Sequence, residues 1–379
     1  MSEKVGVFFR MDRYGGVQSC IISLVKALNA RGVIPTLVWD LPPSQKILDE
    51  SGIHADWEVR STLFPSRLID RLPALLRYLP LALNAVGTRR YSQRFDVMFL
   101  FANWFIADPT VRHVYYSSGP PLLPQLDPVE TGLRGALRSF QRGLYHWLVR
   151  PFLPAYEVHP GSPYFINSRF TAELLKEAHG VEAPVAYPPI PIRDLIPPVR
   201  AAERRSVVFF SRLVDYKRPE WVLEIARRHP DLPVKIMGGG VANREAYLQE
   251  LRAACAALPN VELLENPSTP AVKQTLAEAR FYVFPAVNEH FGMTTVEAIA
   301  AGAVPFVHNS GGQREIVPPE ALRFDDPDFH AKFDALLALP PQDLEALRKA
   351  CEDHMWSFDE SEFQRKMLSA VYPSEAPHA

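Results

Sequence analysis

Two glutamates, with a glycine and two threonines between them, are the residues of this chain best suited to chemistry on a ligand. The stretch NEHFGMTTVE places Glu289 and Glu297 in a Glu-x7-Glu pattern. A carboxylate can accept hydrogen bonds from two neighbouring hydroxyl groups, so the pair suits a ligand that carries diols. The spacing alone is a weak signal, because two solvated acids at this distance also arise by chance.

The residues around these glutamates predict a strand, a loop and a helix. The apolar run Phe281–Pro285 favours a buried strand, and Thr294–Ala301 favours a helix that begins near Met293. We therefore expect Glu289 in the loop after the strand and Glu297 about one turn into the helix. Because unpaired N–H groups at a helix N-terminus attract phosphate, the glutamates would lie on either side of an anion site.

Two cations follow another predicted strand. Arg212 and Lys217 stand in FFSRLVDYKRPE, just after the apolar run SVVFF. Cations at the carboxyl end of a strand could neutralise a diphosphate leaving group, where charge builds as a glycosidic bond breaks. Ordinary surface arginine and lysine are the alternative. Gly238 ends a further strand and allows close backbone approach, although a plain turn explains it equally well.

Composition limits the classes of protein to which the chain can belong. Its 379 residues suit two domains, and its formal net charge of −2 argues against nucleic acid as the main partner. Leu72–Val86 is too short and too interrupted to span a bilayer. Cys20, Cys255 and Cys351 form no C-x-x-C pair, which favours reduced thiols of a cytoplasmic protein over a disulfide framework or a zinc site.

The order of predicted elements indicates an α/β protein made of two similar halves. An apolar strand at Val5–Phe9 is followed by a glycine loop with Gly15 and Gly16 and then a helix at 19–31. Strand–helix–strand order of this kind predicts a parallel, doubly wound sheet. A proline-rich stretch at Tyr187–Arg205 predicts a linker, after which the pattern restarts. Ligands of such sheets bind at the carboxyl ends of the strands, so we expect a cleft between the halves.

The run FYVFPAVNEHFGMTTVEAIAAGAVPFVHNSGGQREIV resembles the retaining GT-B-fold glycosyltransferases of family 4, also called group 1. Within them, NEHFG, VE and HNSGG are most similar to the α-1,2-mannosyltransferases that extend the dolichol-linked oligosaccharide. YPPI is also similar to bacterial mannosyltransferases. The resemblance implies two Rossmann-like domains: residues 1–190 for the acceptor and residues 200–350 for the nucleotide sugar. A C-terminal helix and tail at 351–379 would cross back to the first domain, with Trp356 and Phe358 packed at the crossing.

The resemblance also implies roles for individual residues. Glu289 would contact hydroxyls of the donor sugar near the reacting carbon, and Glu297 would bind the ribose diol. Arg212 and Lys217 would hold the diphosphate. The remaining donor contacts would come mainly from backbone at Gly15, Gly16, Gly238, His290, Phe291, Gly292, Met293, Thr294 and Thr295. The implied donor is a GDP- or UDP-linked hexose, with no cofactor and no metal. Asp325–Asp328, DDPD, looks like an acidic metal motif, but we interpret it as a solvated turn.

One departure from the family concerns the first half. The family often has a histidine in a Tyr-x-His-x-Pro pattern, whereas this chain has Ser118 there, and His113 is expected to be packed rather than catalytic. Two arginine-rich stretches, Arg60–Arg94 and Arg134–Arg150, could lie on anionic lipid at the inner face of a membrane, or could equally flank an oligosaccharide groove. A glycan or lipid-diphosphate acceptor follows from the resemblance. A nucleotide-sugar epimerase and a non-catalytic sugar-nucleotide-binding scaffold are the competing functions.

Overall fold

The computed structural model describes residues 3–12, 15–69, 71–72, 80, 83–84, 87–101, 105, 107–119, 162–197, 204–240 and 244–373. The basic stretch Arg134–Arg150 lies outside these residues. The chain divides into two compact units. The first unit contains residues 1–189 together with 360–379, and the second contains residues 190–359.

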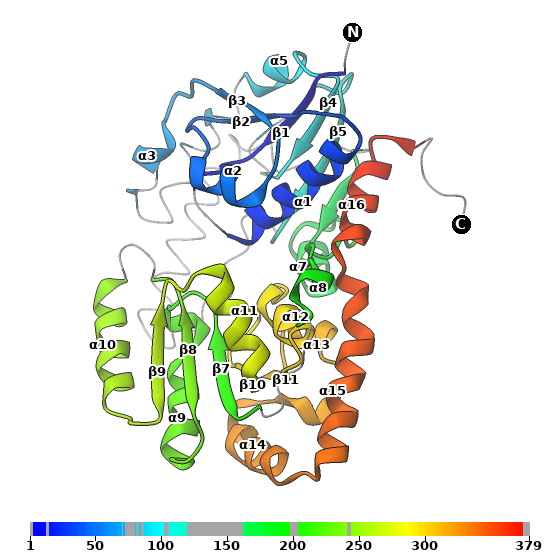
Figure 1. The fold of residues 1–379 in the computed structure, drawn as a ribbon. Helices are drawn as coiled ribbons and strands as arrows, with labels where there is room; N and C mark the ends of the chain where they lie inside the picture. Colours follow the sequence, from blue (N-terminus) through cyan, green and yellow to red (C-terminus); the bar gives the residue numbers. More distant parts are fainter. Residues whose placement is uncertain are drawn as a thin grey trace. The chain divides into compact units, whose positions relative to one another are not determined.

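The first unit is built on a sheet of six parallel strands in the order β3-β2-β1-β4-β5-β6 (Figure 1). The strands are β1 Val5–Phe8, β2 Thr36–Trp39, β3 Asp56–Val59, β4 Val97–Leu100, β5 Arg112–Ser117 and β6 Tyr164–Ile166. Its helices are α1 Gly16–Ala30, α2 Gln45–Ser51, α3 Ser66–Ile69, α5 Thr88–Ser92, α7 Arg169–His179 and α16 Glu360–Ser369.

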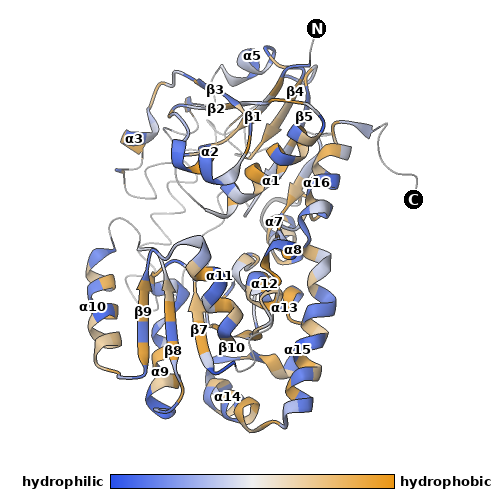
Figure 2. Cartoon of the chain, viewed as in Figure 1, coloured by the Kyte–Doolittle hydropathy of each residue, from blue (hydrophilic) through white to orange (hydrophobic). Residues whose placement is uncertain are grey.

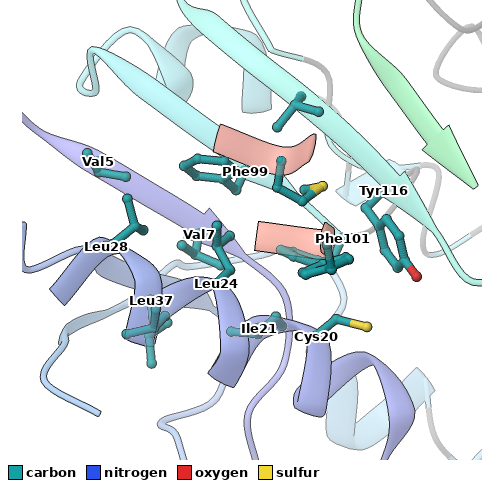
Figure 3. Packing of buried hydrophobic residues seen from close by; sticks show 14 of the residues in the cluster. Val5, Val7, Cys20, Ile21, Leu24, Leu28, Leu37, Phe99, Phe101 and Tyr116 are labelled. Atoms are coloured by element: carbon teal, nitrogen blue, oxygen red, sulfur yellow. The ribbon is translucent and has the colours of Figure 1, made fainter. Parts of the chain in front are cut away.

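One of the two hydrophobic clusters described in the first unit lies between this sheet and α1. Val5 and Val7 of β1 face Leu24 and Leu28 of α1, and Phe99 of β4 continues the same apolar layer (Figure 3). The described strands β1 and β4 are buried along their whole length. Such continuous apolar runs are typical of parallel strands that are covered on both faces.

The last helix of the chain, α16, belongs to the first unit and packs beside α1 (Figure 1). Phe363 and Met367 of α16 are buried in the core of that unit. Two partly buried hydrogen bonds join the same helices: Ser23 Oγ donates to Glu360 Oε2 at 3.2 Å, and Gln364 Nε2 donates to the Ser23 carbonyl oxygen at 3.1 Å. The C-terminal segment therefore completes a core that begins at residue 5.

The second unit has its own sheet of six parallel strands, in the order β12-β11-β10-β7-β8-β9. The strands are β7 Ser206–Phe210, β8 Val234–Gly238, β9 Val261–Glu265, β10 Ala279–Phe284, β11 Val304–His308 and β12 Arg323–Phe324. The helices are α8 Ile192–Leu195, α9 Glu220–Arg228, α10 Glu245–Ala256, α11 Thr269–Glu278, α12 Met293–Ala300, α13 Gln313–Ile316, α14 Phe329–Ala338 and α15 Pro341–Met355.

Hydropathy follows this layering. In Figure 2, strands β8 and β9 are mainly hydrophobic, whereas helices α10 and α15 mix hydrophilic and hydrophobic residues. The second sheet, read as β9-β8-β7-β10-β11-β12, has the same order as the first. In each unit the first strand along the chain lies between the second and the fourth. In a sheet of this kind the order reverses beside the first strand, here between β7 and β10, and ligands bind at the carboxyl ends of the strands there.

The doubly wound α/β class expected from the sequence is confirmed, with local differences. Strand β3 was not anticipated, because Asp56–Val59 is largely exposed and has no apolar run to reveal it. The first helix begins at Gly16 rather than near Ser19, since the Ser19 amide already donates to the Gly15 carbonyl oxygen at 3.1 Å. Gly16 therefore lies in the first turn of α1, and only Gly15 remains in the loop.

Candidate functional site

The loops after β7 and β10 bring together the charged residues singled out in the second half of the chain. Arg212 follows β7, Lys217 ends a short 3-10 helix at Asp215–Lys217, and Glu289 lies in the loop after β10. Because β7 and β10 are hydrogen-bonded, parallel neighbours, the loops that follow them lie side by side at the carboxyl end of the sheet. Strand order reverses between these two strands, and doubly wound sheets bind ligands at that point.

A buried ion pair joins the two loops. Lys217 Nζ donates to Glu289 Oε2, and the Lys217 side chain is only 10% exposed. Burial acts to raise the pKa of Glu289, but the charges of Lys217, His290 and Arg212 outweigh it and hold the pKa below its usual value. Glu289 is therefore ionised at neutral pH. The pair gives one edge both a cation suited to phosphate and an acceptor suited to hydroxyl groups.

Arg212 occupies a more open position than Lys217. Its side chain is exposed, and its guanidinium carbon lies 5.7 Å from the centre of the Tyr216 ring. Lys217 Nζ lies 5.5 Å from the same ring. Tyr216 thus lies close to both cations, and the more exposed Arg212 is accessible to an anion from solvent.

A glycine loop after β11 supports the backbone around Glu289. A Cβ on Gly311 would lie 2.3 Å from the Glu289 carbonyl oxygen, and one on Gly312 would lie 2.5 Å from the His290 carbonyl oxygen. The Gly312 amide donates to that Glu289 oxygen at 2.7 Å, and the Asn288 amide donates to Ser310 Oγ at 2.8 Å. Residues 309–312 therefore fix the path of the loop that carries Glu289.

The loop leads into α12 through Gly292, whose φ of 109° favours glycine. The side chains of the first turn are engaged internally: Thr294 Oγ1 bonds the Tyr282 hydroxyl at 2.7 Å, and Thr295 Oγ1 donates to Gln313 Oε1 at 2.9 Å. The Thr295 amide donates to the Gly292 carbonyl oxygen. Among the described residues, no acceptor is found for the amides of Met293 and Thr294. These two amides are thus the ones available to a phosphate.

Glu297 lies in the second turn of α12, eight residues after Glu289. Burial raises the pKa of Glu297 to about 7. Within the described part of the chain, no hydrogen bond or ion pair to its carboxylate is found. A partly buried carboxyl group without a protein partner can accept hydrogen bonds from a ligand diol.

Comparison with known proteins identifies the second unit. Residues 195–352 match the family model for glycosyl transferases group 1. The chain contains a group 1 glycosyltransferase domain. Glu289, Glu297, Arg212 and Lys217 all lie inside the matched segment.

Individual relatives match part of the chain. The GDP-Man:Man(3)GlcNAc(2)-PP-Dol alpha-1,2-mannosyltransferase of Xenopus laevis is 32% identical over 148 residues, which are 36% of this chain and 30% of that protein. The D-inositol 3-phosphate glycosyltransferase of Mycobacterium sp. (strain KMS) is 24% identical over 241 residues, 56% of this chain and 54% of that protein. The matches thus span well under two thirds of these curated relatives.

Solved structures match the whole chain in fold. Anabaena Alr3699/HepE, crystallised with UDP and glucose, superposes with a TM-score of 0.70 at 16% identity, covering 98% of this chain and 100% of its own. WaaG, a glycosyltransferase involved in lipopolysaccharide biosynthesis, gives a TM-score of 0.64 at 14% identity, covering 97% and 99%. The fold is the GT-B fold of two Rossmann-like units.

The other predicted donor residues fall in two places. In the group 1 domain, Gly238 ends β8, and a Cβ there would lie 1.7 Å from the Ser211 carbonyl oxygen, so the position excludes other residues. His290 is exposed and Phe291 is buried against Phe358. Gly15 and Gly16 lie at the start of α1 in the first unit, and they are not brought together with the group 1 residues inside one unit.

His113 and Ser118, the residues considered in place of the family's histidine, form hydrogen bonds to neighbouring residues of the first unit. His113 of β5 bonds the Val111 carbonyl oxygen at 2.7 Å through Nδ1 and Ser162 Oγ at 2.8 Å through Nε2. The Ser118 carbonyl oxygen accepts a hydrogen bond from Asn167 Nδ2 at 2.8 Å. His113 is therefore held within the sheet region of the first unit.

Sequence reasoning missed a second ion-paired group near the candidate site. Arg218 donates to both carboxylate oxygens of Asp326, at 2.8 and 2.9 Å, and His308 Nε2 lies 3.2 Å from the same carboxylate. Asp326 belongs to DDPD, the segment that we interpreted as a solvated turn. One of its carboxylates therefore forms ion pairs with other parts of the second unit. Among the described residues, no group of three or more His, Cys, Asp or Glu side chains could hold a metal ion.

Gln313 was also missed. It is fully buried, and its Nε2 lies 2.3 Å from the position that a Cβ on Gly292 would take. Together with its bond from Thr295, this places Gln313 directly behind the start of α12. The only sequence signal was its position after the SGG of the glycine loop.

Some arginines of the first basic stretch are already paired. Arg94 forms an ion pair with Glu58 at 2.6 Å, and Arg89 with Asp108 at 3.1 Å. None of the helices in the described part of the chain has the length and apolar character required to cross a membrane. The three cysteines are free and buried, as expected for reduced thiols.

Proposed function

We propose that this chain is a retaining glycosyltransferase that moves a hexose, with mannose favoured, from a nucleoside diphosphate sugar to a hydroxyl of a glycan or lipid-linked oligosaccharide. The observation that carries this proposal is the Lys217–Glu289 ion pair beside the start of α12, at the reversal point of the sheet in a group 1 glycosyltransferase domain. The mannosyltransferase relative supports mannose as the transferred sugar.

The proposed division of labour follows the two halves of the chain. Residues 200–350 bind the nucleotide sugar, residues 1–190 bind the acceptor with Gly15 and Gly16 near the phosphates, and residues 351–379 form the returning C-terminal segment. The diphosphate lies against the Met293 and Thr294 amides. Glu297 accepts hydrogen bonds from the ribose hydroxyls, and Glu289 accepts them from the sugar.

The proposed reaction proceeds on one face of the sugar. The bond between the anomeric carbon and the diphosphate oxygen breaks with its electron pair on the oxygen, and the acceptor hydroxyl bonds to the same face of that carbon. The departing diphosphate takes the proton of the acceptor hydroxyl. Arg212 and Lys217 stabilise the charge that builds on the diphosphate, so the step needs no metal.

Binding is tested by a thermal-shift panel of GDP, UDP and ADP, followed by their sugars. A ligand that binds only the folded state raises the melting temperature by mass action. We expect one nucleotide to stabilise the wild type and to stabilise Lys217→Met much less. Lys349→Met, which removes an exposed lysine from α15, should respond like the wild type. Equal responses in all three proteins would contradict a diphosphate site at Lys217.

Turnover separates the transferase from the other functions. A labelled nucleotide sugar should transfer its sugar only when an acceptor is present, with the anomeric configuration retained by NMR. Conversion of the donor to an isomeric nucleotide sugar without acceptor would identify an epimerase. Binding without turnover across a range of acceptors would identify a scaffold.

The basic stretches Arg60–Arg94 and Arg134–Arg150 support a further part of the proposal, contact with the inner face of an anionic membrane where a lipid-diphosphate acceptor would lie. Sedimentation with anionic liposomes at low salt, lost at high salt, is the expected result. Failure to sediment at low salt would leave a soluble glycan as the proposed acceptor.

A further inference from the structure

A second concave site lies at the amino-terminal end of the sheet in the second unit, opposite the candidate donor site. A cavity of about 380 Å³ is lined by Arg204, Arg280, Gly302, Val304, Pro341, Leu344, Glu345 and Arg348. Arg204 precedes β7, Arg280 is the second residue of β10, and Gly302 precedes β11, so the cavity lies at the amino ends of these strands. The candidate donor site lies at their carboxyl ends, and the two sites are therefore separate.

Arg204 is fixed by backbone contacts at the end of α12. Its Nη2 donates to the Ala301 carbonyl oxygen at 2.9 Å, and its Nη1 lies 3.4 Å from the Ala279 carbonyl oxygen. A Cβ on Gly302 would lie 2.5 Å from Arg204 Nη2, and Gly302 has a φ of 93°. The glycine thus leaves the space that the guanidinium group occupies.

Arg348 contributes a second, pre-oriented guanidinium group. Its side chain is 9% exposed, and it is held by the carboxylates of Glu345 and Glu352 on its own helix, α15. Its Nε donates to Glu345 Oε2 at 2.7 Å. These carboxylates offset its charge, so the attraction of the cavity for an anion depends above all on Arg280.

Arg280 has no carboxylate partner among the described residues. Its guanidinium carbon lies 5.0 Å from the centre of the Phe281 ring, and no hydrogen bond or ion pair joins its side chain to any residue that the structure describes. A half-buried arginine of this kind in a concave wall presents its N–H donors to a ligand. Guanidinium groups match the oxygens of phosphate with paired hydrogen bonds.

We propose that this cavity binds a small metabolite through its phosphoryl group, with Arg280 and Arg204 contacting the phosphoryl oxygens. The apolar side chains of Val304, Pro341 and Leu344 line the rest of the cavity and contact the organic part of the ligand. The volume falls in the range typical of small-molecule sites. The proposal does not depend on the function proposed for the carboxyl edge.

Thermal shifts with inorganic phosphate, at constant ionic strength maintained with sodium chloride, test the site. We expect the melting temperature of the wild type to rise with phosphate, and the apparent affinity to fall about tenfold or more in Arg280→Gln. Arg280→Lys keeps the charge and should bind with intermediate affinity. Arg227→Gln removes an exposed arginine of α9 and should respond like the wild type.

The donor-site variant Lys217→Met locates the phosphate. The response should persist in Lys217→Met and weaken, with the tenfold or greater loss of affinity given above, in Arg280→Gln. The reverse pattern, or no response in the wild type, would overturn the proposal. Glycerol 3-phosphate should bind more tightly than inorganic phosphate because it also contacts the apolar wall. Equal affinity of the two probes would overturn the assignment to a phosphorylated metabolite.

Discussion

The carboxyl group of Glu297 titrates near neutral pH, because burial raises its pKa to about 7 from an ordinary 4.5. Between these values the folded protein holds the proton more tightly than the unfolded chain does. The free energy of unfolding should therefore fall as pH rises through this window, by an amount on the order of 2–3 kcal/mol.

Urea denaturation of the ligand-free protein at pH 5 and pH 8 measures this effect. Glu297→Gln cannot ionise, so it should lose less stability between the two pH values than the wild type. Glu250→Gln, at an exposed position on α10, is the matched control and should behave like the wild type. An unchanged pH dependence in Glu297→Gln would show that this carboxyl group does not titrate in the window.

The two cations at this site, Arg212 and Lys217, should each affect the rate of the proposed reaction. Arg212→Ala or Lys217→Ala should each lower turnover by about 10² or more, a typical loss for one group that stabilises charge in the transition state. Steady-state rates with saturating donor and acceptor measure the loss. Near-normal turnover in both variants would exclude the proposed contact with the diphosphate.

At the scale of elements, the loop 309–312 and the loop before α12 are packed backbone against backbone. Gly312 has a φ of −66°, which any residue can adopt, so the effect of Gly312→Ala depends only on space. Its Cβ would meet the His290 carbonyl oxygen at 2.5 Å and Phe291 Cα at 2.7 Å. We expect a lower melting temperature, and weaker nucleotide binding as the loop carrying Glu289 shifts.

Gly239→Ala provides the comparison for this variant. The nearest atom to its added Cβ would be Asn266 Oδ1 at 3.0 Å, on a side chain that can move. Its melting temperature should change less than that of Gly312→Ala. If the two variants lose the same stability, backbone contact between the two loops is not the reason for the glycine at position 312.

At the scale of the whole molecule, the chain passes from the second unit back to the first between residues 359 and 360. Phe358 packs on Phe291 and His354 in the second unit, whereas Phe363 packs on Tyr116 in the first. Trp356, by contrast, is 40% exposed, with Arg193 5.5 Å from its ring centre. Two phenylalanines close in sequence therefore stabilise different cores.

Hydrogen exchange on Phe358→Ala and Phe363→Ala tests this assignment. Removing a buried phenylalanine costs about 3–5 kcal/mol. Phe363→Ala should lower protection mainly in β1 and α1, and Phe358→Ala mainly in β10 and α12. Equal loss of protection in both units from either variant would show that the two cores unfold as one.

The neighbourhood of Glu289 and Glu297 could be predicted because it is local. An apolar strand, a glycine near a helix start and a small apolar helix lie within about twenty residues, and each signal acts on its own neighbours. The same reasoning failed at β3, where an exposed edge strand carries no apolar pattern. Gln313 was missed because its burial depends on contact with Gly292, which lies in the loop before α12 and not in the local sequence around Gln313.

By itself, the sequence determined the α/β class, the two-part organisation and the local order of strand, loop and helix around the candidate site, since hydrophobic periodicity and glycine positions act over short distances. Only the tertiary structure decided that Lys217 pairs with Glu289, that α16 completes the first core, and that Arg204, Arg280 and Arg348 line one cavity. The physical reason is that strand order brings distant segments together. Pairing of β7 with β10 is a property of the whole sheet that no single segment encodes.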